Sequence, residues 1–260
     1  MYGKIQEDGT FTTETTIGYS DVDYTLKLKP QRVLELCQDI AVLHSDTAGY
    51  SLQFFRDNNS GWGLTEWHII FSGRPFEGEK LDVSTWTNRY KRVQAHRSFK
   101  GVDKNGNEIF RCLSRWFLLD TKKRKPKRFD QDFFQSYIPS DLPMAIEDEN
   151  FKQPPLDLYE EVSKSEHLVT RRDIDANNHT NNIAYIVWAL ETLPTDVYLH
   201  LDIKDLMTEY KREALLGDLL NMQLLKRTDE NGLLEYSTVF TNTDGDYLCR
   251  VTTKWDPKEK

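Results

Sequence analysis

An internal repeat constrains the fold of this chain more than any other feature. Asp21-Val22-Asp23 lies 152 residues before Asp173-Ile174-Asp175. Farther along, three residues lie 139 positions before an identical residue: Gly78, Gly106 and Trp116 precede Gly217, Gly245 and Trp255. An offset that stays constant across this span is hard to obtain by chance. The change of offset places 13 extra residues in the first copy. We therefore predict a tandem duplication of one structural unit.

Each copy has the pattern of an α+β unit with one long helix and an antiparallel sheet. The first copy predicts a strand at 10–20, a helix at 31–44 and strands at 64–71, 80–86, 95–102 and 109–119. The second predicts a strand at 166–171, a helix from about 182 to 191 and strands at 202–210, 219–225, 234–241 and 248–255. Asn105-Gly106 and Asp244-Gly245 fall between strands as hairpin turns. One helix can cover one face of such a sheet.

The repeat also predicts the domain boundaries. We expect a first domain at 1–120, a connection at 121–160 and a second domain at 161–260. The connection begins with a run of basic residues and then carries four prolines, which is typical of a linker or a wrapped connecting segment. Residues 46–63 form a looser polar stretch in the first copy.

Composition excludes several classes of protein. The net charge of −8 argues against a general affinity for nucleic acid or anionic membranes. No apolar run is long enough to span a membrane, and the N-terminus lacks the pattern of a signal peptide. Cys37, Cys112 and Cys249 are scattered among apolar residues, which favours buried thiols. These features predict a cytoplasmic protein without a cofactor.

The chemistry is concentrated between residues 171 and 185. Asp175, Asn177 and His179 occupy alternate positions, which on an extended segment would point the same way. A predicted helix starts just downstream and would offer unpaired backbone N–H groups. Alone, these residues favour an Asn/Asp-rich turn that caps the helix, since such turns are common. A metal site would need Asp175 and His179 together with Glu213, but no paired His or Cys spacing supports it.

Two motifs resemble those of the double hotdog acyl-acyl carrier protein (acyl-ACP) thioesterases. Residues 173–182, Asp-Ile-Asp-Ala-Asn-Asn-His-Thr-Asn-Asn, are similar to the family's Asp-Leu-Asp-x-Asn-x-His-x-Asn-Asn. Residues 209–214, Glu-Tyr-Lys-Arg-Glu-Ala, are similar to its Glu-Tyr-Arg-Arg-Glu-Cys. The resemblance implies a tandem double hotdog that hydrolyses fatty acyl-ACP. It also implies a catalytic set: Asp175, Asn177, His179 and Glu213.

The resemblance further implies that the first hotdog houses the acyl chain, where Trp67 and Phe71 are candidates to line it. The expected partner is an acyl carrier protein carrying a fatty acyl chain, and a homodimer is possible. Acyl carrier protein is strongly acidic, so the basic runs at 89–92 and 122–125 could steer it. Such runs are equally typical of solvated strand ends and linkers.

Two departures from the family pattern are informative. Ala214 stands where the family motif has cysteine, so water is the better nucleophile. In the first copy, residues 24–27 contain neither Asn nor His at the matching places, and Arg74 stands where Glu213 would be. We therefore predict one active site per chain.

The chemistry of a thioester assigns roles to these residues. Its thiol leaving group has a pKa near that of cysteine, about 8.5, so the enzyme mainly needs a base and oxyanion donors. We expect Glu213 to be the base with His179 in the same relay, although Asp175 could exchange roles with Glu213. Asn177 and N–H groups at the helix start would stabilise the oxyanion. Alternatives are an acyl-CoA thioesterase, a hotdog hydratase and a non-catalytic acyl-binding protein.

Overall fold

The computed structural model describes residues 3–91, 93–128, 131–137, 140–147 and 151–257. The chain divides into two compact units. The first comprises Met1–Thr65 and Ile69–Asn150, and the second comprises Glu66–His68 and Phe151–Lys260. We describe each unit by itself.

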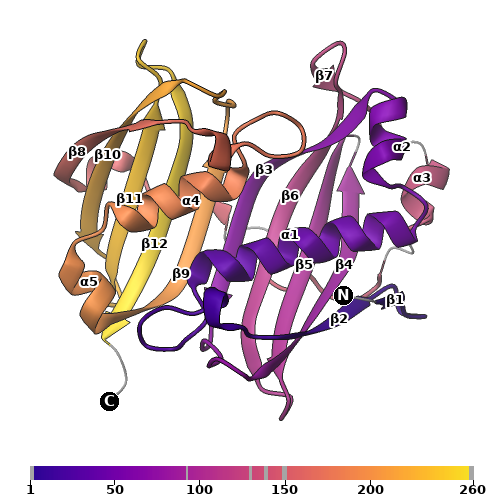
Figure 1. Ribbon diagram of the computed structural model, residues 1–260, viewed down its shortest axis with the longest axis horizontal. Helices are drawn as coiled ribbons and strands as arrows, with labels where there is room; N and C mark the ends of the chain where they lie inside the picture. Colours follow the sequence, from indigo (N-terminus) through magenta and orange to yellow (C-terminus); the bar gives the residue numbers. More distant parts are fainter. Residues whose placement is uncertain (1–2, 92, 129–130, 138–139, 148–150, 258–260) are drawn as a thin grey trace. The chain divides into compact units, whose positions relative to one another are not determined.

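The first unit is an antiparallel sheet with one long helix. Its sheet has the strand order β1-β2-β4-β5-β6-β3, and β7 pairs with β6. The strands are β1 (Lys4–Ile5), β2 (Phe11–Thr16), β3 (Ser60–Phe71), β4 (Lys80–Lys91), β5 (Gln94–Asp103), β6 (Glu108–Asp120) and β7 (Lys125–Pro126). The helices are η1 (Tyr19–Asp21), α1 (Pro30–Thr47), α2 (Leu52–Asp57) and α3 (Gln131–Gln135). The long helix α1 runs across one face of this sheet (Figure 1).

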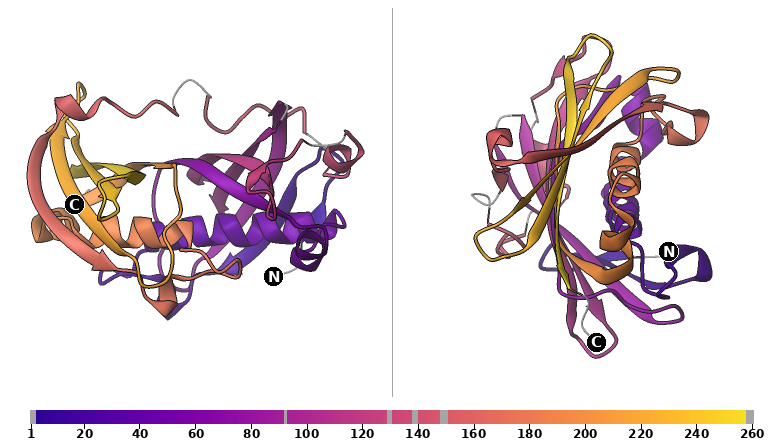
Figure 2. Two further views of the ribbon diagram at one scale, coloured as in Figure 1. Left: turned by 90° about the horizontal axis from the view of Figure 1, so that it is seen from above. Right: turned by 90° about the vertical axis from the view of Figure 1, so that its left-hand side faces the viewer.

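The second unit repeats this plan. Its sheet has the order β9-β12-β11-β10-β8. The strands are β8 (Glu160–Leu168), β9 (Leu201–Tyr210), β10 (Leu219–Thr228), β11 (Leu234–Thr241) and β12 (Tyr247–Pro257). The helices are η3 (Leu156–Leu158), η4 (Arg171–Asp173), α4 (Asn182–Glu191) and α5 (Thr195–His200). Each unit places its main helix inside the curve of its own sheet (Figure 2), which is the arrangement of a hotdog fold.

The two main helices are held by their apolar faces but start differently. Buried residues of α1 recur at helical spacing along the face that meets the sheet, from Val33 through Cys37 and Ile40 to His44. Its first residue is Pro30, and no side chain caps its N-terminus. Helix α4 is capped, because the Asn181 side chain accepts a hydrogen bond from the backbone N–H of Ile183.

The predicted repeat is confirmed, and equivalent residues of the two copies form equivalent hydrogen bonds. Gly78 donates its backbone N–H to Ile17 at 2.8 Å, and Gly217 donates to Val169 at 3.1 Å. Both glycines have positive φ angles, +82° and +90°, which glycine adopts without steric cost. The two tryptophan indoles likewise donate to a hydroxyl two residues earlier in their own strand, Trp116 to Ser114 and Trp255 to Thr253.

The connection between the repeats is wrapped and largely ordered, rather than a free linker. Phe134, Tyr137 and Ile146 are buried against the first unit. The Tyr137 hydroxyl donates to Ser45 at 3.1 Å. The looser stretch at 46–63 also holds more structure than its polarity predicts, because it contains α2 and the start of β3.

The predicted strand at 166–171 is wrong at its end. Strand β8 stops at Leu168, and Arg171–Asp173 form the 3₁₀ turn η4. The side chain of Asp173 accepts hydrogen bonds from the backbone N–H and the hydroxyl of Thr170, at 2.8 and 2.6 Å. This capping arrangement competes with strand geometry and turns the chain toward the predicted site.

Candidate active site

The polar motif forms a tight turn between Ile174 and Thr180, which face each other as an antiparallel bridge. Asp175 donates its backbone N–H to the His179 carbonyl at 2.9 Å, and Asn178 has a φ of 64°. Asn tolerates this left-handed conformation better than most residues. The expectation of an extended segment with alternating side chains is therefore wrong, because the chain reverses within the motif.

The Asp175 carboxylate is the centre of this turn. Its Oδ1 accepts hydrogen bonds from the backbone N–H of Asn177 at 2.8 Å and of His179 at 3.2 Å. Its Oδ2 accepts a hydrogen bond from the Asn177 side-chain amide at 3.2 Å. One carboxylate thus fixes the backbone of the loop and orients Asn177.

The Glu213 carboxylate is brought to this turn by a second set of hydrogen bonds. Thr180 donates both its backbone N–H and its hydroxyl to the Ala214 carbonyl, at 3.1 and 2.8 Å. The Ala214 N–H in turn donates to the Tyr185 hydroxyl at 3.2 Å. As a result, His179 Nε2 lies 3.4 Å from Glu213 Oε2. Both side chains reach solvent, with exposed fractions of 31% and 45%, so water can reach the pair.

Four backbone N–H groups around the start of α4 are already occupied. Thr180 donates to Ala214, Asn181 donates to Asp173 at 2.7 Å, and Ala184 donates to the Asn181 carbonyl at 2.9 Å. The N–H of Ile183 binds the Asn181 side chain at 3.0 Å. The predicted supply of free donors at this helix start is therefore wrong for these four groups.

The start of α4 is held instead by two aromatic side chains. The Trp67 indole donates to the Asn182 side chain at 3.3 Å, and the Tyr210 hydroxyl donates to the Asn182 carbonyl at 2.8 Å. Trp67 is fully buried and groups with the second unit, although the sequence places it in the first repeat. Phe71 is also buried, in the first unit. Contact of either residue with an acyl chain stays a prediction.

The three cysteines lie outside the cluster. Cys37, Cys112 and Cys249 are buried. Burial raises the pKa of the Cys112 and Cys249 thiols well above the ordinary value, which suppresses the thiolate form. Within the ranges that the structure describes, no group of three or more His, Cys, Asp or Glu residues could hold a metal ion. In the same ranges, no helix combines the length and hydropathy needed to cross a membrane.

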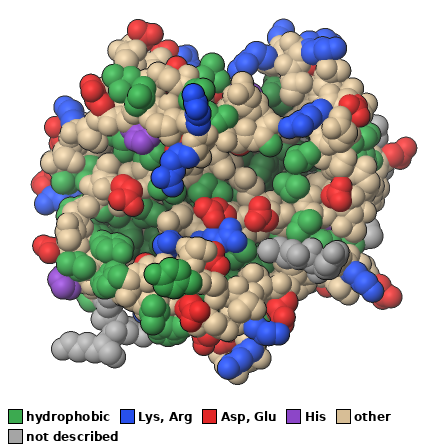
Figure 3. Space-filling model, in the orientation of Figure 1, with side chains coloured by type: hydrophobic (Ala, Val, Ile, Leu, Met, Phe, Trp, Pro, Cys, Tyr) green, Lys and Arg blue, Asp and Glu red, His purple; other side chains and the backbone are tan. Residues whose placement is uncertain are grey.

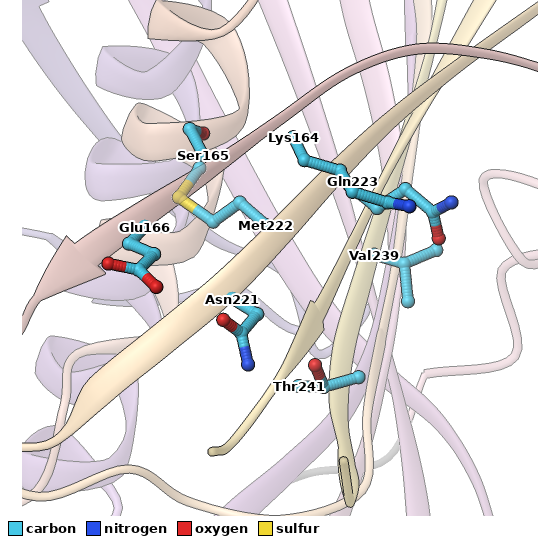
Figure 4. Close-up of a pocket in the computed structure, with 8 residues that line it drawn as sticks. All are labelled: Lys164, Ser165, Glu166, Asn221, Met222, Gln223, Val239 and Thr241. Atoms are coloured by element: carbon cyan, nitrogen blue, oxygen red, sulfur yellow. The ribbon is translucent and has the colours of Figure 1, made fainter.

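The second unit also contains a cavity of about 510 Å³ (Figure 4). It is lined by residues 164–166 of β8, 221–223 of β10, and Val239 and Thr241 of β11. None of the four predicted catalytic residues lines it. The cavity and the cluster are thus separate features of this unit.

The fold and the cluster first define a class. The chain is a tandem hotdog protein whose second repeat carries an Asp-organised turn with a paired His and Glu. The acyl-ACP thioesterase N-terminal domain matches residues 8–137, and the acyl-ACP thioesterase C-terminal domain matches residues 157–257. The chain therefore belongs to the acyl-ACP thioesterase family.

Individual relatives agree with this assignment. The chain is 28% identical to an acyl-[acyl-carrier-protein] hydrolase of Cuphea viscosissima, over 83% of this chain and 52% of the relative. It is 25% identical to oleoyl-acyl carrier protein thioesterase 2 of Arabidopsis thaliana, over 94% of this chain and 70% of the relative. The chain spans 52–65% of the length of three of the curated plant relatives that it matches.

Solved structures share the fold. A 12:0-ACP thioesterase from Umbellularia californica superposes with a TM-score of 0.84 at 21% identity, covering 96% of this chain and 95% of that one. An acyl-ACP thioesterase from Bacteroides thetaiotaomicron gives 0.81 at 24% identity, covering 96% and 99%.

Sequence reasoning missed the residues that assemble the cluster. Three side-chain hydroxyls do this. Those of Thr180 and Tyr185 hold Ala214, next to Glu213, against the turn. That of Tyr210 holds the start of α4. The repeat held a partial signal, because the backbone bond from Thr180 to Ala214 has its counterpart between Leu28 and Pro75. The hydroxyl contacts are specific to the second copy and had no such signal.

Proposed function

We propose that this protein hydrolyses the thioester of a fatty acyl-ACP and releases the free fatty acid, using water as the nucleophile. The observation that carries the proposal is the 3.4 Å pairing of His179 with Glu213 beside the Asp175 turn, in a chain of this family. The pair is accessible to water, and its two groups can relay a proton.

Glu213 acts as the general base, with His179 as its relay partner. The Asp175 carboxylate already accepts three hydrogen bonds from the turn that it organises. These bonds engage both oxygens of the carboxylate in holding the turn. The geometry therefore favours Glu213 over Asp175 for proton abstraction and gives Asp175 a positioning role.

Asn177 stabilises the oxyanion of the tetrahedral intermediate. Its side-chain amide has two hydrogens, and the bond to Asp175 engages one of them. The second can donate to a developing negative charge, while Asp175 holds the amide in place. The engagement of the backbone donors of 180, 181, 183 and 184 supports giving this role to the Asn177 side chain.

Water is the nucleophile because no thiol can serve. Ala214 stands at the position where the family motif has cysteine, and its methyl side chain is buried. The leaving thiolate needs little protonation, so one base and one oxyanion donor are sufficient.

Acyl carrier protein is the proposed carrier of the acyl group. In Figure 3, Lys and Arg side chains gather over the turn between β6 and β7, where residues 122–125 are exposed. This basic turn could attract an acidic carrier. The other basic run, 89–92, lies outside the part of the structure whose side chains are described. A homodimer and the cellular compartment stay predictions.

An activity assay tests the proposal directly. The purified full chain should release free fatty acid from a panel of saturated acyl-ACPs of differing length. Matched acyl-CoA thioesters should react more slowly, because CoA lacks the protein surface of the carrier. Equal or faster turnover of acyl-CoA would replace the carrier assignment, and no turnover of either series would reject the hydrolase.

A further inference from the structure

An arginine is buried inside the first unit, where none of the described acidic residues forms an ion pair with it. Arg97 lies on β5, on the face that meets α1, and only 7% of its surface is accessible. Burial lowers its pKa to about 10, which still leaves the guanidinium charged at neutral pH. Burying an unpaired charge is unfavourable, so an arginine in this place requires a reason.

The contacts of Arg97 are all with neutral groups. Its Nη1 donates to His44 Nδ1 at 2.9 Å and to the Thr85 hydroxyl at 3.3 Å. The guanidinium carbon lies 5.8 Å from the centre of the Tyr137 ring. Among the described residues, no carboxylate forms an ion pair with it. The hydrogen bonds found to its guanidinium among these residues use Nη1 alone, so Nε and Nη2 are available as further donors.

Two neighbouring residues leave buried polar atoms unused as well. Burial, and then the Arg97 charge, lower the pKa of His44 to about 3, so its ring is neutral. Since Nδ1 accepts from Arg97, the proton is on Nε2, and this buried N–H faces the Tyr137 backbone without a hydrogen bond of normal geometry. Thr87, directly opposite Arg97 on β4, has a buried hydroxyl without a partner among the described residues.

The hotdog fold does not require a cation at this position. The second repeat has Tyr236 at the place of Arg97, and the registers agree: Arg97 pairs with Ser114 and Tyr236 with Thr253. Unpaired donors therefore gather around Arg97 for a reason other than the sheet. The donors of Arg97, His44 and Thr87 would be satisfied by a buried group that carries several acceptor oxygens.

We propose that Arg97, with His44 and Thr87, binds a carboxylate at the far end of the acyl chain. The first unit would then favour acyl groups that carry a carboxylate at the ω end over acyl groups that end in a methyl group. This inference rests on the proposed function, in which the first unit receives the acyl chain. A planar guanidinium fork matches a carboxylate, and the neutral His44 and Thr87 add donors without adding charge.

The test compares two substrates that differ only at the ω end. Dodecanoyl-ACP and ω-carboxydodecanoyl-ACP are assayed with the wild type and with Arg97→Met, and the readout is the ratio of their kcat/KM values. The wild type should prefer the carboxylated chain. Arg97→Met should lower this preference by about tenfold to a hundredfold, the range for losing a charged hydrogen bond in a buried site. An unchanged ratio would overturn the proposal.

Arg111→Met is the matched control, since Arg111 is a partly exposed arginine on β6 that pairs with Glu108. This variant should keep the wild-type ratio; a change as large as that in Arg97→Met would count against the assigned site. Arg97→Lys keeps the charge without the fork and should give an intermediate ratio. If Arg97→Met fails to fold while Arg97→Lys keeps the full preference, the arginine is structural and the proposal fails.

Binding measurements separate this inference from the hydrolase proposal. Dodecanedioic acid should raise the melting temperature of the wild type more than dodecanoic acid does, because ligands that bind the folded state stabilise it. In Arg97→Met the two acids should act alike. If no thioester is hydrolysed but this Arg97-dependent difference persists, the hydrolase proposal fails and the carboxylate site stands. Equal effects of both acids on the wild type would remove the site.

Discussion

The two repeats build the same turn and use it differently. In the first, Asp23 accepts hydrogen bonds from the backbone N–H and the hydroxyl of Thr25, at 2.8 and 2.6 Å. Asp23 also donates its own N–H to the Lys27 carbonyl at 2.9 Å, as Asp175 does to His179. The aspartate therefore belongs to the fold, and both copies need it.

The partner of each turn differs in charge and burial. Arg74 occupies the place of Glu213 and forms a largely enclosed ion pair with Asp23 at 2.6 Å. Both of its side chains are about one-tenth exposed, whereas the His179 and Glu213 side chains reach solvent. One turn is closed by a structural salt bridge and the other is left open beside a proton-transfer pair. The comparison shows that the fold requires the aspartate of each turn, whereas His179 and Glu213 require another explanation.

The largest effect that would test this comparison is on catalysis. Glu213→Gln removes the proposed base and keeps the size of the side chain, so kcat should fall by about 10²- to 10⁴-fold. Urea unfolding should show little change, because Glu213 is partly exposed. Hydrolysis within threefold of the wild type would contradict the assignment of Glu213.

The matching change in the first repeat should affect stability instead of catalysis. Arg74→Met leaves the buried Asp23 carboxylate without its cation, which should lower the free energy of unfolding by about 3 kcal/mol while kcat stays close to wild type. Glu213→Gln should thus lower kcat without changing stability, and Arg74→Met should lower stability without changing kcat. Loss of kcat in folded Arg74→Met would show that the first turn contributes to the chemistry.

The same ion pair predicts a pH dependence. Burial by itself raises the pKa of Asp23, but the Thr25 hydroxyl and Arg74 outweigh it and hold the pKa below the ordinary 3.8. Stability from a lowered carboxylate pKa is present above the ordinary value and is lost as pH falls through the folded value. The stability gap between wild type and Arg74→Met should therefore narrow below about pH 4. A gap that stays constant down to pH 2 would exclude this origin.

The smallest expected effect concerns backbone strain in the turns. Leu26 has a φ of 60° and occupies the place of Asn178, which has a φ of 64°. This conformation costs most residues about 1–2 kcal/mol, whereas Asn tolerates it. Leu26→Asn should therefore raise the free energy of unfolding by about 1 kcal/mol, measured by urea titration. Asn178→Leu should lower it by a similar amount, and stabilisation by both substitutions would contradict the strain argument.

Much of the fold could be predicted because it follows from residue spacing and from patterns within short segments. The offsets between Gly78 and Gly217 and between the two tryptophans give the duplication, and helical spacing gives α1 and α4. The predicted end of the strand before η4 was wrong because the side chain of Asp173 caps the backbone there. Capping competes with strand formation over a few residues. Which of the two forms depends on whether the side chain can reach the backbone N–H, and that depends on the folded conformation.

The candidate site could be predicted only in part. Asp175, Asn177 and His179 are close together in the sequence, but their extended arrangement was wrong, since Asp175 folds the segment onto itself. The choice between Asp175 and Glu213 as base was open in the sequence. We assign Asp175 to positioning because its carboxylate holds the turn, and Glu213 to proton abstraction because it lies beside His179, and both observations depend on coordinates.

The sequence by itself determined the repeat, the family motifs and the residue types that can carry out the chemistry. Only the tertiary structure decided that Thr180 draws Ala214, and with it Glu213, to the His179 turn across 34 positions of sequence. Only the tertiary structure showed Arg97 buried against His44. The physical reason is the same in both cases: periodicity and local motifs define elements, whereas contacts between distant residues form only when the elements pack.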